Sequence, residues 1–343
     1  MTSAKPEQLQ RTEPVRIASG RNRGSMQLQA KRFASLVRHG TLELYRFEGQ
    51  YLGSPIRIIV AEDGSTINYI KKLIFTDEPV TTHIGTISAF SGPGLIHSDA
   101  DIVIAGANHM LLNAYSNQGF YIVPKWIQLF VPIWDHPDTM YSRLDLDRTT
   151  RKYFRRLSRT IETMGYSFAV TVDQGWFDYF YYHMYLPYAR RRHQDMAVIH
   201  SYNTVQQNFS RGMGVAIMKD GELLGGGIVI CEGKTMSFRH MGMVDGSIEA
   251  SRDGASSALD YFVVRFGHSR GCNQMNFGHT RAFTSDGVLR YKLTWQARVE
   301  NDDDAISAFA IGTPGTTPQA RSFLSENRFF HLTPEGVRLY DES

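Results

Sequence analysis

Gly254, Ala255, Ser256 and Ser257 follow one another at the start of a stretch, residues 254–270, with apolar residues at helical spacing. These four residues would therefore open a helix. The first turn of a helix leaves backbone N–H groups unpaired and carries a partial positive charge. Small side chains would let a phosphate approach those donors. The segment predicts a site for a phosphate-bearing carrier, and an ordinary helix start is the alternative.

Tyr291 and Lys292 are neighbours in a second expected helix, residues 287–293. A reaction that builds negative charge on an oxygen, as in an oxyanion, requires groups that stabilise this charge and move protons. A lysine can stabilise the oxyanion or protonate the leaving group, and a tyrosine can also donate that proton. Because neighbouring helical positions point about 100° apart, only one of the two can face the reacting centre squarely. The alternatives are a surface lysine and a core tyrosine.

An expected strand at 235–242 adds three candidates. The backbone around Arg239 and Met241 could hold the carrier and offer an N–H group to the oxyanion. His240 is a candidate general base because its ordinary pKa lies near neutrality, and a structural histidine is the alternative. The twelve histidines show no HExxH or His/Cys spacing. The sequence therefore predicts no metal site.

A helix expected between Asp147 and Met164 carries a basic face. Its six basic residues are spaced at i, i+3, i+4, i+7, i+8 and i+11. They are Arg148, Arg151, Lys152, Arg155, Arg156 and Arg159. Like charges so spaced repel one another, and a polyanion such as tRNA, a phosphorylated acceptor or carboxylates elsewhere in the fold could offset this. A solvated basic face is the alternative. The run Arg190–His193 is a second basic cluster.

The elements that position these residues follow from periodicity and turn signals. In the first half we expect strands at 42–47, 56–61, 67–75 and 121–133, a loop at 88–94, and helices at 99–116 and 147–164. In the second half we expect strands at 166–172, 213–218, 223–231, 235–242, 273–277 and 295–299, and helices at 176–192, 202–209, 254–270 and 287–293. The strands at 213–218, 223–231 and 235–242 are expected to be antiparallel. The helix at 254–270 then connects them to a parallel strand at 273–277, so the fold class is α/β with mixed sheets.

This order, together with residues 254–295, resembles the GNAT superfamily of acyltransferases, in particular its FemAB branch and the BioF2-like enzymes. In the superfamily pattern R/Q-x-x-G-x-G/A, Gly254 matches the first glycine and Ser256 stands at the last position, with Arg252 two residues before the glycine instead of three. Residues 275–279 and 287–295 are similar to the FemAB strand that ends in an aromatic-glycine pair and to its Gly-x-x-x-aromatic-Lys helix. The resemblance implies roles in transfer for Lys292 and Tyr291.

The resemblance also implies two GNAT-like domains in tandem. We expect a flexible tail at 1–25, an N-terminal domain at 26–165 with 301–343 as its candidate completion, and a catalytic domain at 166–300. With 343 residues, a net charge of +3 and 42% hydrophobic residues, the chain has an ordinary globular composition. The N-terminus has no apolar secretory segment, so a cytoplasmic location is expected. The two cysteines, Cys231 and Cys272, form no CxxC pair.

The implied function is direct transfer of an aminoacyl or acyl group to an amine on a small molecule or peptide, without a tightly bound cofactor. No covalent enzyme intermediate is expected, because neither cysteine lies in a nucleophile motif. The displaced Arg252 and the basic helix favour aminoacyl-tRNA as donor, and acyl-coenzyme A is the alternative. A GNAT-fold binding module without catalysis and a nucleic-acid-binding protein are the rival classes. The sequence names neither the acceptor nor the oligomeric state.

Overall fold

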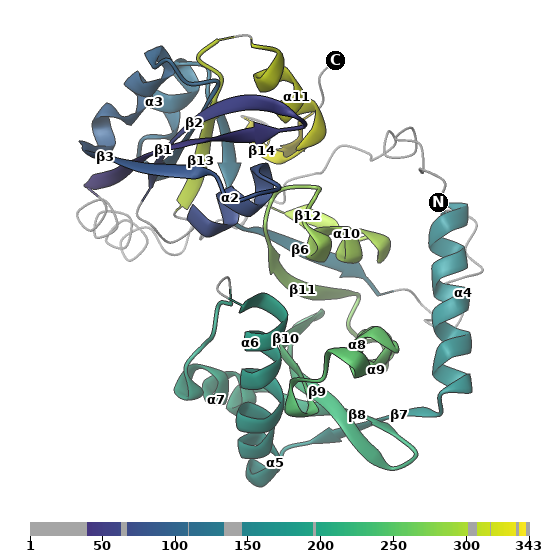
Figure 1. Ribbon diagram of the computed structural model, residues 1–343. Coiled ribbons are helices and arrows are strands. Elements are labelled where there is room, and N and C mark those ends of the chain that lie inside the picture. Colours follow the sequence, from purple (N-terminus) through teal and green to yellow (C-terminus); the bar gives the residue numbers. More distant parts are fainter. Residues whose placement is uncertain are drawn as a thin grey trace. The chain divides into compact units, whose positions relative to one another are not determined.

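The computed structural model describes residues 40–62, 67–108, 110–133, 146–194, 197–300, 307–315, 317–333 and 336–340. The chain divides into two compact units (Figure 1). Unit 1 comprises Met1–Gln128, His279–Arg290 and Val299–Ser343, and unit 2 comprises Leu129–Gly278 and Tyr291–Arg298. The expected tail at 1–25 lies outside the described residues. Both main sheets contain parallel and antiparallel pairs, so the α/β class with mixed sheets is confirmed.

Unit 1 is built on a six-stranded sheet in the order β3-β1-β2-β4-β13-β5, with a two-stranded sheet of β14 and β15. Its elements are β1 (Thr41–Tyr51), β2 (Ser54–Glu62), α2 (Ile67–Ile74), β3 (Val80–Ser88), the 3₁₀ helix η2 (Ala89–His97), β4 (Ile102–Asn108), α3 (Leu112–Asn117), β5 (Tyr121–Pro124), β13 (Ser307–Gly312), α11 (Pro318–Glu326), β14 (Phe330–Thr333) and β15 (Gly336–Leu339). Strand β13 comes from the end of the chain and lies between β4 and β5.

Several segments differ from the sequence-based expectation. Residues 88–94, expected as a loop, lie mostly in η2, strand β3 was not expected, and 121–133, expected as one strand, forms β5 and a separate strand at Ile127–Pro132. Residues 67–75, expected as a strand, form helix α2, in which the buried Ile70 and Ile74 are four residues apart and share one helix face. Residues 102–108, expected inside a helix, form strand β4 between β2 and β13. Their run of β-branched and small residues is buried from Ile102 to Ala105, which is typical of a central strand covered on both faces.

Unit 2 contains most of a seven-stranded sheet in the order β12-β6-β11-β10-β9-β8-β7, of which β12, β6 and β11 include residues assigned to unit 1. Its elements are β6 (Ile127–Pro132), α4 (Arg148–Thr163), β7 (Tyr166–Thr171), α5 (Gln174–Tyr179), the π-helical turn η4 (Phe180–Tyr185), α6 (Leu186–His193), α7 (Tyr202–Arg211), β8 (Met213–Lys219), β9 (Glu222–Glu232), β10 (Thr235–Met243), the 3₁₀ turn η6 (Val244–Gly246), α8 (Ile248–Arg252), α9 (Ala255–Ser269), β11 (Gln274–Thr280), α10 (Gly287–Thr294) and β12 (Arg298–Glu300). The expected order of the second half is confirmed, although the strand at 295–299 is shorter than expected and 176–192 is divided by η4.

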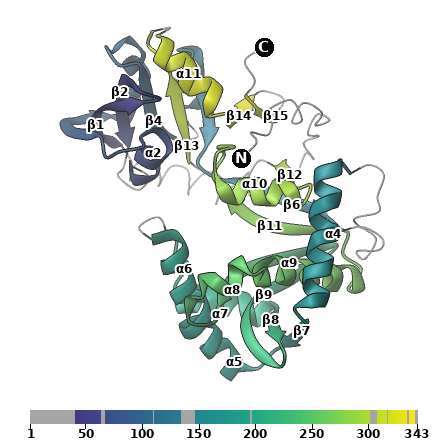
Figure 2. The ribbon, with the colours of Figure 1, turned by 45° about the vertical axis from the view of Figure 1, so that its right-hand side comes forward.

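Helices cover both faces of this sheet (Figures 1 and 2). Ile228 and Ile230 of β9 pack into the apolar cluster of α5, η4 and α7. Met236 of β10 points to the opposite face, where a Cβ on Gly267 of α9 would lie 3.4 Å from its side chain. Among the described residues, no helix is long and apolar enough to cross a bilayer.

Candidate functional site

Strands β10 and β11 run parallel for three residues and then separate. Their pairing ends where Ser237 faces Asn276, but β10 continues to Met243 and β11 continues past Phe277. Beyond that point β10 and β11 no longer pair with each other, so backbone groups there take other partners. In β11, the Gly278 N–H donates to Asn276 Oδ1 at 2.8 Å, and the Gly278 carbonyl oxygen accepts from Lys292. These divergent edges are the frame of the candidate site.

A β-bulge interrupts β10 within the divergent segment. The register with β9 shifts between Arg239 and Gly242, so His240 and Met241 are the bulged residues. His240 has a φ of +53°, a left-handed conformation that is uncommon for residues other than glycine. On one side of the bulge, a Cβ on Gly242 would lie 2.5 Å from the backbone nitrogen of Tyr185 in η4. The bulge and the π-helical turn are therefore packed main chain against main chain. Arg239 and Met241 are both half-buried.

The His240 side chain points to helix α7 and the π-helical turn. Its Nε2 atom lies 2.8 Å from Nδ2 of Asn208, and its ring packs edge-on against Tyr185 and His200. Burial, with a smaller effect of His200 and Arg239, lowers the pKa of His240 to about 4. The imidazole is therefore neutral at neutral pH, with Nε2 accepting a hydrogen bond from Asn208.

Helix α9 begins after Gly254, which has a φ of +104° and makes no side-chain cap. A Cβ at this position would lie 3.3 Å from the methyl group of Thr160 in α4, so α4 closes this side of the helix start. Ala255 is buried, Ser256 and Ser257 are half-buried, and Arg252 is exposed at the end of α8.

The guanidinium group of Arg192, from the basic run Arg190–His193, lies near the start of α9. Ser256 Oγ lies 3.0 Å from Ser251 Oγ, and Arg192 of α6 donates from Nη1 to Ser251 Oγ at 3.3 Å. The same atom donates to the Tyr188 hydroxyl at 2.5 Å. Among the described residues, no carboxylate forms an ion pair with Arg192. This guanidinium can therefore meet an anion near the helix start.

Tyr291 of α10 reaches the first turns of α9. Its hydroxyl oxygen lies 3.3 Å from Ser257 Oγ and 2.5 Å from Oδ2 of Asp260. Burial and the nearby Asp260 raise the pKa of Tyr291 well above its ordinary value, so the phenol keeps its proton at neutral pH. The buried hydroxyl of Tyr153 lies in the same cluster, close to Ser257 and Tyr291.

Lys292 is buried, with 8% of its surface exposed. Its Nζ atom donates to the carbonyl oxygen of Gly278 at 3.2 Å. Gly278 has a φ of +72° and belongs to the divergent part of β11. The ammonium group therefore sits against the divergent edge rather than in solvent, where most lysines are found.

Helix α4 carries the six basic residues as expected, with Asp147 as its N-cap. Five of them are exposed and Arg151 is half-buried. No ion pair joins any of the six to a carboxylate in the part of the chain that the structure describes. The opposite face of α4 buries Phe154 and Leu157, and Phe154 packs edge-on against Trp295.

The structure thus brings together Ser257 and Tyr291, and it places Lys292 on the divergent edge of β11. His240 contacts η4, α7 and His200 instead of α10. Asp260 was not among the predicted site residues, although it is a lone carboxylate among the apolar positions of 254–270. Arg192 was also left unassigned, because no sequence pattern connects residue 192 to residue 251.

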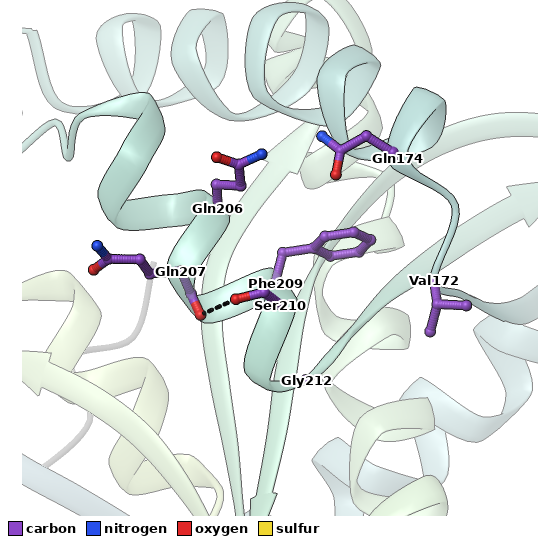
Figure 3. Close-up of a pocket in the computed structure, with 7 residues that line it drawn as sticks. All are labelled: Val172, Gln174, Gln206, Gln207, Phe209, Ser210 and Gly212. Carbon is purple, nitrogen blue, oxygen red and sulfur yellow. Dashed lines mark hydrogen bonds between the residues drawn. The ribbon is translucent and has the colours of Figure 1, made fainter.

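A pocket of about 480 Å³ lies elsewhere in unit 2 (Figure 3). Its lining residues are Val172, Gln174, Gln206, Gln207, Phe209, Ser210 and Gly212. The pocket lies at the end of β7 where Thr171 faces Gly214 of β8. At the other end of β7, the Tyr166 hydroxyl donates to the carbonyl oxygen of Asp253, next to α9. The pocket and the start of α9 are thus at opposite ends of a strand roughly 17 Å long. Within the described ranges, no three His, Cys, Asp or Glu side chains gather closely enough to hold a metal ion.

Comparisons with known proteins found matches among solved structures. No family model and no curated protein matches the sequence. L-PGS from Bacillus licheniformis matches at 11% identity with a TM-score of 0.36, over 86% of this chain and 95% of that one. FemX matches at 12% identity with a TM-score of 0.40, over 82% and 90%. A putative GNAT-family acetyltransferase from Novosphingobium aromaticivorans matches at 13% identity with a TM-score of 0.31, over 66% and 80%.

Proposed function

We propose that unit 2 is an acyltransferase that moves an acyl group from a phosphate-bearing carrier onto an amine, with aminoacyl-tRNA as the favoured donor. The observation that carries this proposal is the approach of Tyr291 to Ser257, 3.3 Å between hydroxyl oxygens. It sets a protonated phenol beside the first turn of α9, the expected carrier site. Lys292 adds a cation on the adjacent divergent edge.

The proposed reaction is a direct transfer. The amine nitrogen attacks the carbonyl carbon of the ester, and a C–N bond forms as the carbonyl oxygen becomes an oxyanion. Lys292 and backbone N–H groups at the bulge would stabilise this charge. The C–O bond to the carrier then breaks, and Tyr291 donates a proton to the leaving ribose oxygen. The amine loses one proton, so the tyrosine is reprotonated and no net charge accumulates.

The unpaired cations favour tRNA over a smaller carrier. Five exposed basic residues on α4 have no carboxylate partner in the described residues, and a polyanion would offset their mutual repulsion. Because Gly254 packs against Thr160 of α4, the basic helix and the expected carrier site belong to one packed region of unit 2. The contact of Arg192 with Ser251 would suit a phosphate of either donor.

The test uses the full chain. It is incubated with total tRNA charged with labelled amino acids and, separately, with labelled acetyl-coenzyme A, each with a mixture of amino acids and short peptides as acceptors. We expect label to move from tRNA into an amide. Transfer from coenzyme A alone would overturn the donor assignment but keep the transferase. Transfer from neither donor by folded protein would contradict the proposed function.

A further inference from the structure

Asp260 is a buried acid that the reaction outlined above does not use. It lies on α9 with 3% of its surface exposed, beside the buried Leu259, Val263 and Val264. A carboxyl group at such a site is costly unless it is hydrogen-bonded. Its partner is Tyr291, whose hydroxyl oxygen lies 2.5 Å away. The nearest positive charges that act on Asp260 are those of Lys292 and Arg192.

Charged and titratable groups face Asp260 from three other helices. Tyr291 and Lys292 come from α10, Arg192 from α6 and Tyr153 from α4. Burial raises the pKa of Asp260 to about 7, against the opposing effects of the Tyr291 hydrogen bond and of the positive charges on Lys292 and Arg192. Protonated and ionised forms of Asp260 are therefore both populated near neutral pH.

We propose that Asp260 is a positioning residue that sets the direction of the Tyr291 hydroxyl group. This inference rests on the proposed function of Tyr291 as proton donor. An ionised carboxylate can only accept a hydrogen bond, so it holds the phenolic hydrogen inward. A protonated carboxyl group donates to the Tyr291 oxygen instead, and the phenolic hydrogen is then free to point outward at a leaving group.

The two forms predict opposite effects on transfer. The protonated form is the competent one, so the step that uses Tyr291 slows as the pH rises through the pKa of Asp260. Asp260→Asn keeps the shape of the side chain and supplies a permanent donor, the amide NH₂ group. This variant therefore imitates the protonated acid at every pH. Asp260→Ala removes both the hydrogen-bond acceptor and the hydrogen-bond donor, and it leaves the Tyr291 hydroxyl group without this partner.

The first test is a pH profile of kcat and KM for the full chain, with charged tRNA as the donor. We expect the ratio of the Asp260→Asn rate to the wild-type rate to rise about tenfold per pH unit above 7, because the competent wild-type fraction falls by that factor. We expect Asp260→Ala to lower kcat with KM unchanged. Asp77→Asn is the matched control, because Asp77 is an exposed aspartate of unit 1, outside unit 2, which carries α9. Equal pH profiles for wild type and Asp260→Asn would overturn the proposal.

The second test needs no activity. Carboxyl resonances are followed by NMR in protein labelled with ¹³C-aspartate, and Asp260 is identified by its absence in Asp260→Asn. We expect it to titrate near pH 7, and Tyr291→Phe to move the titration to higher pH by removing a hydrogen bond to the carboxylate. If the titration of the Asp260 resonance is unchanged in Tyr291→Phe, the coupling between the two residues is refuted. If the coupling is found but neither donor is used, the proposed function fails and the coupling stands.

A second inference comes independently from the two cysteines. Cys231 at the end of β9 is exposed and Cys272 before β11 is buried, and their sulfur atoms lie 3.2 Å apart. Cys231 faces Met236 of β10, and Met236 in turn faces Met275 of β11. The thiol pair therefore lies at the end where β10 and β11 are still paired.

We infer that the two thiols form a reversible disulfide with a disulfide oxidant such as oxidised glutathione. The exposed Cys231 thiolate attacks the oxidant and releases one glutathione thiolate. The Cys272 thiolate then attacks the Cys231 sulfur and releases the second. Two protons and two electrons leave the protein. Burial and the Cys231 contact raise the pKa of Cys272 to about 12, so the second step is slow at neutral pH and accelerates with rising pH.

The full chain is treated with oxidised glutathione, unfolded in an alkylating agent and weighed by mass spectrometry. We expect wild type to lose both alkylation sites without keeping glutathione, and its Tm to rise until dithiothreitol is added. Cys272→Ser should keep one glutathione on Cys231, and Cys231→Ser should stay unmodified. A wild-type protein that keeps a stable glutathione adduct, or two alkylated cysteines, would overturn the inference.

Discussion

Gly242 of β10 meets Tyr185 of η4 main chain to main chain: a Cβ on Gly242 would lie 2.5 Å from the Tyr185 nitrogen. The contact joins the strand just beyond its bulge to a π-helical turn inside the long helical segment 174–193. Because neither partner is a flexible side chain, no rotamer change can make room for a larger residue.

Gly242→Ala should lower the free energy of unfolding by about 1–3 kcal/mol, the usual cost of overpacking. Urea unfolding of the full chain would measure it. Gly287→Ala is the control, since a Cβ there has no atom within 4 Å. Equal stability of the two variants would mean that β10 and η4 are less tightly packed than described.

Asp260 should make the fold less stable as the pH rises. Its pKa is raised from 3.8 to about 7 in the folded chain, so folding favours the protonated form. Stability from this group is complete below pH 4 and is lost as the pH rises through 7, by up to about 4 kcal/mol. Asp260→Asn should therefore be more stable than wild type at pH 8 and gain little at pH 4. Denaturant unfolding at the two pH values checks the sign.

His240 should act in the opposite direction. Its folded-state pKa of about 4 lies below the ordinary 6.5, so folding favours the neutral ring. The stability it contributes is present above pH 6.5 and is lost as the pH falls through 4, by up to about 3 kcal/mol. His240→Asn tolerates the left-handed backbone and removes the titration. Between pH 7 and pH 4, the free energy of unfolding of His240→Asn should fall less than that of wild type. If both proteins lose the same free energy over this range, His240 is not the source of the pH dependence.

Lys292→Met should lower kcat/KM for transfer by about 10²–10³-fold, the loss typical of one oxyanion donor. The measurement is transfer from the donor that wild type uses, with Tm recorded to confirm folding. Lys234→Met, at an exposed lysine, should leave the rate unchanged. Full activity in a folded Lys292→Met protein would remove this residue from the reaction.

The double variant Arg151→Glu, Arg155→Glu should weaken tRNA binding and flatten its salt dependence. Each lost phosphate contact reduces the slope of log K against log salt by about 0.7–0.9. Binding is measured by fluorescence anisotropy at several salt concentrations. The control is Lys72→Glu, Arg321→Glu, the same charge change at exposed residues of unit 1. Equal slopes for both double variants would remove the basic face as an RNA site.

Sequence patterns predicted the order of elements in unit 2 well, because its strands alternate and its turns carry Asp-Gly and Glu-Gly signals. They failed at 67–75 and 102–108 in unit 1. Residues 67–75 combine apolar residues with Asn68, Lys71 and Lys72, and 102–108 is a short apolar run. At such lengths periodicity alone separates helix from strand poorly. Burial by distant partners decided the outcome: β4 is enclosed by β2 and by β13 from the far end of the chain.

The candidate site could be predicted as two segments but not as a cluster. Ser257 and Tyr291 were visible as residue types suited to the chemistry, and their approach depends on how α10 packs against α9. The contact of Arg192 with Ser251 spans 59 residues, and no local pattern encodes such a distance. The bulge at His240 likewise depends on the register between β9 and β10.

Where β10 continues beyond its pairing with β11, the polar atoms along its edge belong to the peptide units themselves. Replacing one side chain with another leaves these atoms in place, so an alanine scan from Phe238 to Met241 would be blind to them. Proline is the replacement that deletes an N–H group. The hydrogen-bonding groups of this edge can thus be kept through many side-chain substitutions, provided that the backbone conformation is unchanged.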